Sequence, residues 1–201
     1  MAKGGSFELE VSKKLSLWLS DGKRDDLVCR NDTSGGRATV RVKNKKQTNC
    51  YMHGDLKHSD DQAKPLFDLW SVECKTGYAS KSVLKDGTKK VVNWDVLDLL
   101  DSRQKKPTIC SMWEQCVNDA DLSRRQPVLI FRRNQKDICI AVNLNYHLSL
   151  YRYFNKIAKG YLFIEAIIPS MYIPNNHIVI MKFSEFLEWV NPKTLIDMRI
   201  K

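Results

Sequence analysis

The sequence lacks a long apolar segment. No stretch approaches the roughly 20 consecutive apolar residues that a membrane-spanning helix needs. The richest run, residues 161–181, contains Glu165, two prolines and two asparagines. The stretch MAKGGSFELE at residues 1–10 also lacks the apolar core of a signal peptide. We therefore expect a soluble protein that does not act in a membrane.

Paired cysteines are missing as well. The six cysteines are Cys29, Cys50, Cys74, Cys110, Cys116 and Cys139, and no two of them form a CxxC pair. Several of them lie in apolar stretches, as small core residues do. This usage indicates a reducing compartment. Zinc held by Cys50, His53 and His58 would need a fourth ligand at a recognisable spacing, and the sequence offers none.

Acidic residues are too few to balance the basic ones. Asp and Glu total 23 against 33 Lys and Arg, which gives a formal net charge of +10. A polyanionic partner then gains attraction from counterion release, so nucleic acid is the leading candidate and an anionic membrane surface the second. Internal repeats and low-complexity linkers are also missing, and 201 residues, 43% of them hydrophobic, suffice for one substantial core. We expect a single domain.

The first clear element is a helix that begins near Ser6, a candidate N-cap. Phe7, Val11 and Leu15 recur at helical spacing. Projection at about 100° per residue places Glu8 within this apolar stripe, so its side chain faces inward. Two explanations stay open: an acid in the first turn that is favoured by the helix dipole, or a carboxylate that reaches into an active site.

Strand patterns dominate the rest of the chain and alternate with helical ones. Strands are predicted within residues 26–43 (two, around a glycine-rich turn at 33–36), 51–57, 67–75, 127–134, 137–144 and 177–183, and helices at 94–102, 109–123 and 184–190. A basic hairpin turns at Asp86-Gly87. Residues 146–154 fit either a helix or a strand. This order predicts an α/β fold with a mixed β-sheet.

The stretch WSVECKTG, residues 70–77, places an acidic and a basic side chain two apart in a strand pattern. The two-residue period puts Glu73 and Lys75 on one face, and Trp70 and Cys74 on the other. Such a pair is most often a solvated face or a same-side ion pair. Here it follows an apolar run, where charges are costly unless they are paired or used.

Asp55 is a candidate partner for Glu73, because it lies beside Gly54 at the predicted end of its own strand. Two adjacent strands would bring both carboxylates to one edge of the sheet. Hard oxygen ligands of this kind suit Mg²⁺, which keeps several waters and leaves positions open for phosphate oxygens. Lys75 projects on the same side and can stabilise charge on a phosphate or position the attacking water.

These residues resemble the PD-(D/E)xK nuclease superfamily. Gly54-Asp55 and then Glu73-Cys74-Lys75 follow the TSGG turn at residues 33–36 and Glu8 on the leading helix. This order and spacing are similar to those of archaeal-type Holliday junction resolvases and related phage-encoded endonucleases. Glycine stands where the name-giving motif has proline.

The resemblance covers about residues 6–135 and implies a restriction-endonuclease-like mixed β-sheet flanked by helices. It also implies one nuclease-like domain over residues 1–201, with a core at about 6–143 and a C-terminal extension, 144–201, packed on it. Residues 78–93 and 145–201 have no clear counterpart in the resolvases, which leaves junction specificity open.

The resemblance implies a metal-dependent endodeoxyribonuclease that uses Mg²⁺, with Mn²⁺ able to substitute. Its metal ligands would be Asp55, Glu73, the backbone carbonyl of Cys74, and Glu8. Ser34 would lie near the scissile phosphate, and Gln115 matches a glutamine often found in the helix after the E-x-K strand. We expect a homodimer, because symmetric cutting of two strands calls for two sites, and action in the cytoplasm of a bacterial or archaeal host cell, with a viral origin.

Basic residues that flank the proposed site in sequence would supply the DNA-binding surface. Any one of them is more often simply a solvated charge, but as a group they fit contact with a phosphate backbone. They are Arg30, Arg37, Lys81, Lys85, Lys89, Lys90, Arg124, Arg125, Arg132 and Arg133.

Two other functions stay open. One is a non-catalytic DNA-binding or packaging accessory protein that retains the nuclease fold. The other is an RNA-processing enzyme or RNA binder, because positive charge does not distinguish DNA from RNA. Metal-dependent cutting separates the nuclease from the accessory protein, and a choice between DNA and RNA substrates separates it from the RNA enzyme.

Overall fold

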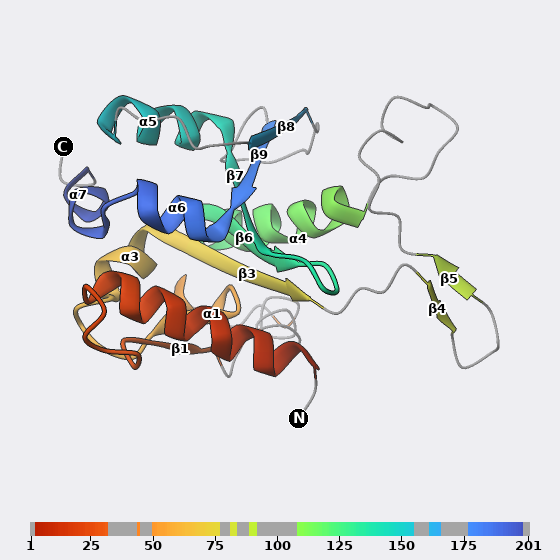
Figure 1. Ribbon diagram of the computed structural model, residues 1–201, viewed down its shortest axis with the longest axis horizontal. Coiled ribbons are helices and arrows are strands. Elements are labelled where there is room, and N and C mark those ends of the chain that lie inside the picture. The colour runs from red at the N-terminus through yellow and green to blue at the C-terminus, as the bar shows by residue number, and fades with distance from the viewer. Residues whose placement is uncertain are drawn as a thin grey trace.

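The computed structural model describes residues 3–31, 44, 50–76, 81–83, 89–91, 108–154, 161–165 and 177–198 (Figure 1). In chain order, the helices and strands are α1 (Lys3–Leu19), β1 (Val28–Arg30), η1 (Cys50–Met52), β2 (Leu56–His58), α3 (Lys64–Leu69), β3 (Trp70–Thr76), β4 (Lys81–Val83), β5 (Lys89–Val91), α4 (Thr108–Ser123), β6 (Gln126–Arg132), β7 (Ile138–Asn143), α5 (Leu144–Phe154), β8 (Tyr161–Glu165), β9 (His177–Lys182), α6 (Phe183–Trp189) and α7 (Pro192–Asp197).

The central element is a five-stranded sheet with the strand order β3-β6-β7-β9-β8. β3 runs parallel to β6, and the other neighbouring pairs are antiparallel. The predicted α/β fold with a mixed sheet is therefore confirmed. β1 and β2 form a separate two-stranded sheet, as do β4 and β5. The β4–β5 pair confirms the two strands of the predicted basic hairpin, while its turn at Asp86-Gly87 lies outside the described residues.

Helices cover both faces of the central sheet. One hydrophobic cluster joins Phe7 and Leu15 of α1 and Phe186 of α6 to the sheet face that carries Trp70 and Val72. The second cluster lies on the opposite face of the sheet, where α4 packs against side chains of β6, β7 and β9. Along these strands, the residues of the second cluster alternate with those of the first. Because side chains alternate along a strand, Glu73 and Lys75 belong to the face beneath α4.

Helix α1 begins at Lys3, so the prediction that Ser6 caps it is wrong. Its apolar stripe is buried as predicted, and Phe7, Val11 and Leu15 are all within 1% exposure. Glu8 then lies beyond the first helical turn. The explanation of Glu8 as a first-turn acid favoured by the helix dipole therefore no longer applies.

Strand β3 begins at Trp70, three residues later than predicted. Residues 64–69 form helix α3 instead, with a proline in its first turn and the buried side chains Leu66 and Phe67 on one side. Trp70 has extended backbone angles, so the helix passes directly into the strand. The alternation of apolar residues in this stretch fits a short helix as well as a strand, and packing decides between them.

The C-terminal third contributes to the same core as α1 and β3. Leu150 of α5, Phe186 of α6 and Leu195 of α7 belong to the hydrophobic cluster that contains Trp70. The indole Nε1 of Trp70 donates a 2.6 Å hydrogen bond to the hydroxyl of Tyr146. Residues 146–154, which fitted either element in the sequence, lie within helix α5. The domain boundaries themselves stay a prediction.

Membrane insertion finds no support in the helices of the described ranges. None of them combines the length and the apolar composition that a bilayer crossing requires.

The predicted second strand within residues 26–43 and the predicted helix at 94–102 lie outside the described residues.

Candidate active site

Asp55 directly precedes β2, whereas the sequence placed it at the end of a strand. β2 pairs with β1, and Asp55 is joined to β3 by a hydrogen bond from its backbone amide to the carbonyl of Val72, 2.7 Å long. On its other side the amide of Asn31 donates to the Asp55 carbonyl over 2.8 Å. The backbone of Asp55 is therefore held between the end of β1 and the middle of β3.

Gly54 explains why the proline of the family motif is absent here. Its φ is +84°, in the left-handed region that only glycine adopts without strain. A Cβ at this position would lie 2.9 Å from the carbonyl oxygen of Val72. Proline, whose ring sets φ near −65°, cannot occupy this conformation. Glycine lets the loop approach β3 closely enough for Asp55 to reach it.

The side chain of Asp55 binds the main chain of β3. Its Oδ2 accepts a 2.8 Å hydrogen bond from the amide of Cys74. Val72 and Cys74 therefore both direct main-chain groups toward Asp55, at the edge of β3 opposite β6. Because the N–H and C=O of one strand residue point to the same side, the Cys74 carbonyl faces this edge too.

Glu73 is a buried carboxylate, only 3% exposed. The ammonium of Lys75 forms a short ion pair with its Oε1, which confirms that the two side chains share one face of the strand. The amide Nε2 of Gln115, on α4, donates to the same Oε1 over 2.8 Å. Among the described residues, Oε2 of Glu73 accepts no hydrogen bond.

The charges around Glu73 oppose one another. Burial and, after it, the negative charge of Asp55 raise the pKa of Glu73, Lys75 works in the opposite direction, and the result is a pKa of about 7. A carboxylate that is both buried and close to a second carboxylate gains from a bound cation. The site thus combines two acids with one built-in counter-charge.

Asp119 on α4 is a third acid near this site that sequence reasoning missed. Burial raises its pKa, and the charge of Asp55 raises it further. Asp119 follows Gln115 by four residues, so both side chains lie on the same side of the helix. That spacing is the signal that could have identified it, once Gln115 was assigned to the site.

Glu8 is partly buried, with a 15% exposed side chain, but it is occupied by a basic partner. Its Oε2 accepts a 2.6 Å hydrogen bond from Nε of Arg30. The guanidinium also lies over Gly5, where an added Cβ would come within 3.0 Å of it. The negative charge of Glu8 acts on Cys74, one of the causes that raise the pKa of this thiol after burial, Asp55 and Glu73. The structure thus pairs one predicted metal ligand with one predicted DNA-binding residue.

The donor set fits a hard divalent cation. Within the described ranges, no three His, Cys, Asp or Glu side chains are grouped so that they could hold a metal ion. Mg²⁺ does not need three, because it is commonly bound by one or two carboxylates together with waters and phosphate oxygens. Asp55, the unfilled Oε2 of Glu73 and the Cys74 carbonyl provide such a set.

The predicted DNA-binding residues are described only in part. Arg132, at the end of β6, donates a 2.8 Å hydrogen bond to Glu10 and lies 4.9 Å from the ring centre of Phe7. Arg133 is exposed. The other predictions concern residues or side chains outside the described part of the chain: Ser34, Arg37, Lys81, Lys85, Lys89 and Lys90.

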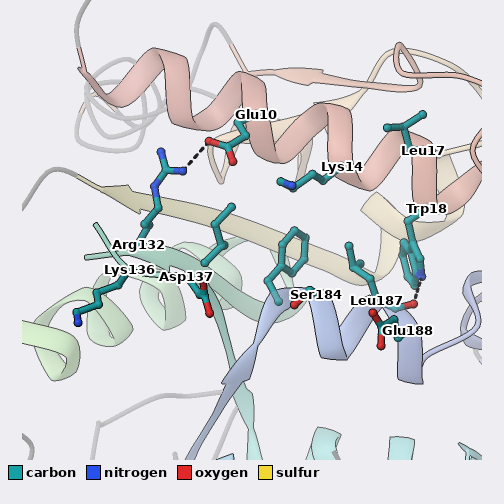
Figure 2. A pocket seen from close by; sticks show the side chains of 12 residues that line it. Glu10, Lys14, Leu17, Trp18, Arg132, Lys136, Asp137, Ser184, Leu187 and Glu188 are labelled. Carbon is teal, nitrogen blue, oxygen red and sulfur yellow. Dashed lines mark hydrogen bonds and ion pairs between the residues drawn. The ribbon is translucent and has the colours of Figure 1, made fainter. Parts of the chain in front are cut away.

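A groove of about 620 Å³ lies on the other side of the sheet from Glu73, between α1 and α6 (Figure 2). The Glu10–Arg132 ion pair stands at one end, and at the other end Nε1 of Trp18 donates to the carbonyls of Leu187 and Val190. Its charged lining residues are three cations and three acids: Lys14, Arg132, Lys136, Glu10, Asp137 and Glu188. This balance gives the groove no excess charge to attract a polyanion.

A family model described as "Phage putative PDDEXK endonuclease" matches residues 1–197. The match includes Asp55, the E-x-K strand and the C-terminal third of the chain. No curated protein and no solved structure matches the chain significantly.

Proposed function

The chain belongs to the phage PD-(D/E)xK endonucleases, and we propose that it hydrolyses phosphodiester bonds of DNA with Mg²⁺ as its metal ion. The observation that carries this proposal is the hydrogen bond from the Cys74 amide to Asp55, which brings one carboxylate to the strand that carries Glu73. The formal charge of +10 supports a polyanionic substrate.

Asp55, Oε2 of Glu73 and the Cys74 carbonyl would hold the metal. When bound, Mg²⁺ lowers the pKa of a coordinated water and offsets the charge that develops on the phosphate. Gln115 donates to Oε1 of Glu73 and so orients the carboxylate with its other oxygen available. This division of the two oxygens is what a metal ligand requires.

Lys75 is the group that we assign to the nucleophile or the phosphate. Its side chain is 16% exposed, and its ammonium bonds to Oε1 of Glu73, which holds the side chain at the site. From there it can donate a hydrogen bond to an attacking water or to a phosphate oxygen. A preorganised donor of this kind contributes most where water is partly excluded.

The test is a cleavage assay on end-labelled linear duplex, flapped and four-way DNA with Mg²⁺, Mn²⁺ or EDTA. We expect cleavage with either metal and none with EDTA. Asp55→Asn and Lys75→Met should each lower the rate by at least about a hundredfold, whereas Arg24→Gln, in a surface ion pair, should not. Full activity of Asp55→Asn would contradict the assignment.

The same panel separates the finer proposals. We propose a branched-DNA substrate, a homodimer that cuts two strands symmetrically, a single catalytic domain, and action in the cytoplasm of a bacterial or archaeal host. Preferred cutting of the four-way DNA would support a resolvase, and preferred cutting of matched RNA would support the RNA enzyme. Metal-independent binding without cutting would support the accessory protein.

A further inference from the structure

Arg125 is a buried arginine between α4 and β6. It is 6% exposed, and burial lowers its pKa from the ordinary value. An arginine has five N–H donors in a fixed planar arrangement, and the guanidinium of Arg125 makes a hydrogen bond with each of five acceptors. They are Ser123 Oγ (3.0 Å) and the backbone carbonyls of Phe67 (2.9 Å), Trp70 (2.9 Å), Cys50 (2.6 Å) and His53 (2.7 Å).

The four carbonyls belong to two separate segments. Phe67 and Trp70 lie where α3 passes into β3, the strand that carries Glu73. Cys50 and His53 lie in the segment that leads directly to Asp55. One side chain therefore binds the backbone of both segments that carry the proposed metal ligands, although it lies 52 residues beyond Glu73 in the sequence.

The loop before Asp55 has a second anchor, the side chain of Asn31. Nδ2 of Asn31 donates to the carbonyls of Tyr51 and Gly54, each over 2.9 Å. Main-chain bonds then connect Asp55 to Asn31 and to Val72. The carbonyl of His53 lies two residues before Asp55. If the guanidinium were removed, this carbonyl would lose its hydrogen-bond donor, and the loop would lose its attachment to the start of β3.

We propose that Arg125 is a positioning residue of the metal site, which sets the placement of Asp55 relative to Glu73 by binding the backbone of both segments. It touches neither the metal nor the DNA. This inference rests on the proposed function, and it adds that the affinity for the metal depends on a residue outside the PD-(D/E)xK motif. The alternative is a purely structural arginine, whose loss lowers stability without a specific effect on metal binding.

The test compares Arg125→Lys and Arg125→Met with Leu195→Ala. Lysine keeps the charge but lacks the planar fork of donors, and Leu195 is a fully buried residue of α7 whose truncation destabilises the protein away from the site. Binding of Mn²⁺ to each purified protein is measured by calorimetry well below the lowest melting temperature. The Mg²⁺ concentration for half-maximal cleavage is measured in parallel.

We expect both Arg125 variants to bind Mn²⁺ about 10- to 100-fold more weakly, as for other residues that orient metal ligands. Added Mg²⁺ should recover part of their cleavage, and Leu195→Ala should bind Mn²⁺ like the wild type. In a third variant, Arg125→Ala, free guanidinium ion at low concentration should partly restore Mn²⁺ binding, and it should have no such effect on Leu195→Ala. If the Arg125 variants do not fold, Ser123→Ala, which removes one acceptor of the guanidinium, replaces them and should weaken Mn²⁺ binding less strongly.

Wild-type Mn²⁺ affinity in folded Arg125 variants, or in Ser123→Ala where it replaces them, would overturn the inference. An equal loss of affinity in Leu195→Ala would overturn it as well, because the effect would then follow stability alone. Failure of the proposed function gives a different result, since the wild-type protein itself would neither bind Mn²⁺ nor cleave DNA.

Discussion

The amide of Cys74 donates a 2.8 Å hydrogen bond to Oδ2 of Asp55. This contact joins two segments that belong to different sheets, because Asp55 precedes β2 of the small β1–β2 sheet and Cys74 lies in β3 of the central sheet. It brings the carboxylate of Asp55 beside the strand position next to Glu73. The candidate site therefore depends on how the two sheets meet rather than on pairing of adjacent strands.

The raised pKa of Glu73 predicts a pH-dependent loss of stability. In the folded protein the carboxyl holds its proton up to about pH 7, whereas the unfolded chain releases it near the ordinary value of 4.5. The free energy of unfolding should therefore fall as pH rises from about 4.5 to about 7, by about 3 kcal/mol from this group. Glu73→Gln cannot titrate and should lack this part of the decrease.

Urea unfolding at pH 5 and at pH 8 in EDTA measures this difference. Mg²⁺ at pH 8 should restore stability to the wild type, because it binds the ionised carboxylates of the folded state, and should not do so for Glu73→Gln. An identical pH dependence in both proteins would show that Glu73 titrates normally.

Gly54→Ala should disturb both stability and the site. The substitution forces alanine to a φ of +84° and places its Cβ against the Val72 carbonyl. Gly22 offers a matched control, since its φ is +81° and nothing lies within 4 Å of an added Cβ. Gly22→Ala should lower the free energy of unfolding by about 1–2 kcal/mol through backbone strain alone. Gly54→Ala should lower it by more, because its Cβ also meets the Val72 carbonyl.

Unfolding and Mn²⁺ titration of the two alanine variants separate the effects. Only Gly54→Ala should weaken metal binding, because only there must the segment carrying Asp55 move away from β3. Equal behaviour of the two variants would mean that the close approach to Val72 has no role in the site.

The Glu10–Arg132 ion pair should restrain DNA binding. The two side chains are 37% and 33% exposed, so the pair contributes at most about 1 kcal/mol to stability. Glu10→Gln should leave stability nearly unchanged and strengthen DNA binding, because Arg132 then becomes available to a phosphate. Adding Arg132→Gln to Glu10→Gln should abolish this gain and reduce the magnitude of the salt slope by about 1 relative to Glu10→Gln.

Fluorescence titration of duplex DNA at several salt concentrations tests this pair. Lys193→Gln, in an exposed pair with Asp21 at the other end of α1, is the control for a simple change of net charge. A salt slope equal to that of the control would place Arg132 outside the DNA contact.

Tyr146→Phe should destabilise the protein through Trp70. The substitution removes the acceptor of the Trp70 indole and leaves a buried N–H without it, at a cost of about 1–3 kcal/mol. Tyr153→Phe, at an exposed position of the same helix, should have little effect. A single unfolding transition that shifts as a whole is expected if the C-terminal third and β3 unfold together. Two transitions, with only one shifted, would indicate separate domains.

Local patterns in the sequence predicted the parts of the site that lie within one element. The two-residue period of a strand was sufficient to place Glu73 and Lys75 on one face, and the helical spacing of α4 was sufficient to predict that helix. These signals are readable because the periods depend only on backbone geometry. The beginning of β3 was misassigned because Leu66 and Phe67 also fit a short helix.

What the sequence by itself determined is the α/β class, the E-x-K pair on one strand face and the family to which the motif order belongs. Tertiary structure alone decided how Asp55 reaches β3, why glycine precedes it, and that Arg125 adjoins the site. Those relationships depend on contacts such as that between Arg125 and the His53 carbonyl, across 72 residues of chain. No local period encodes a contact of that kind, because it arises only when the core brings distant segments together.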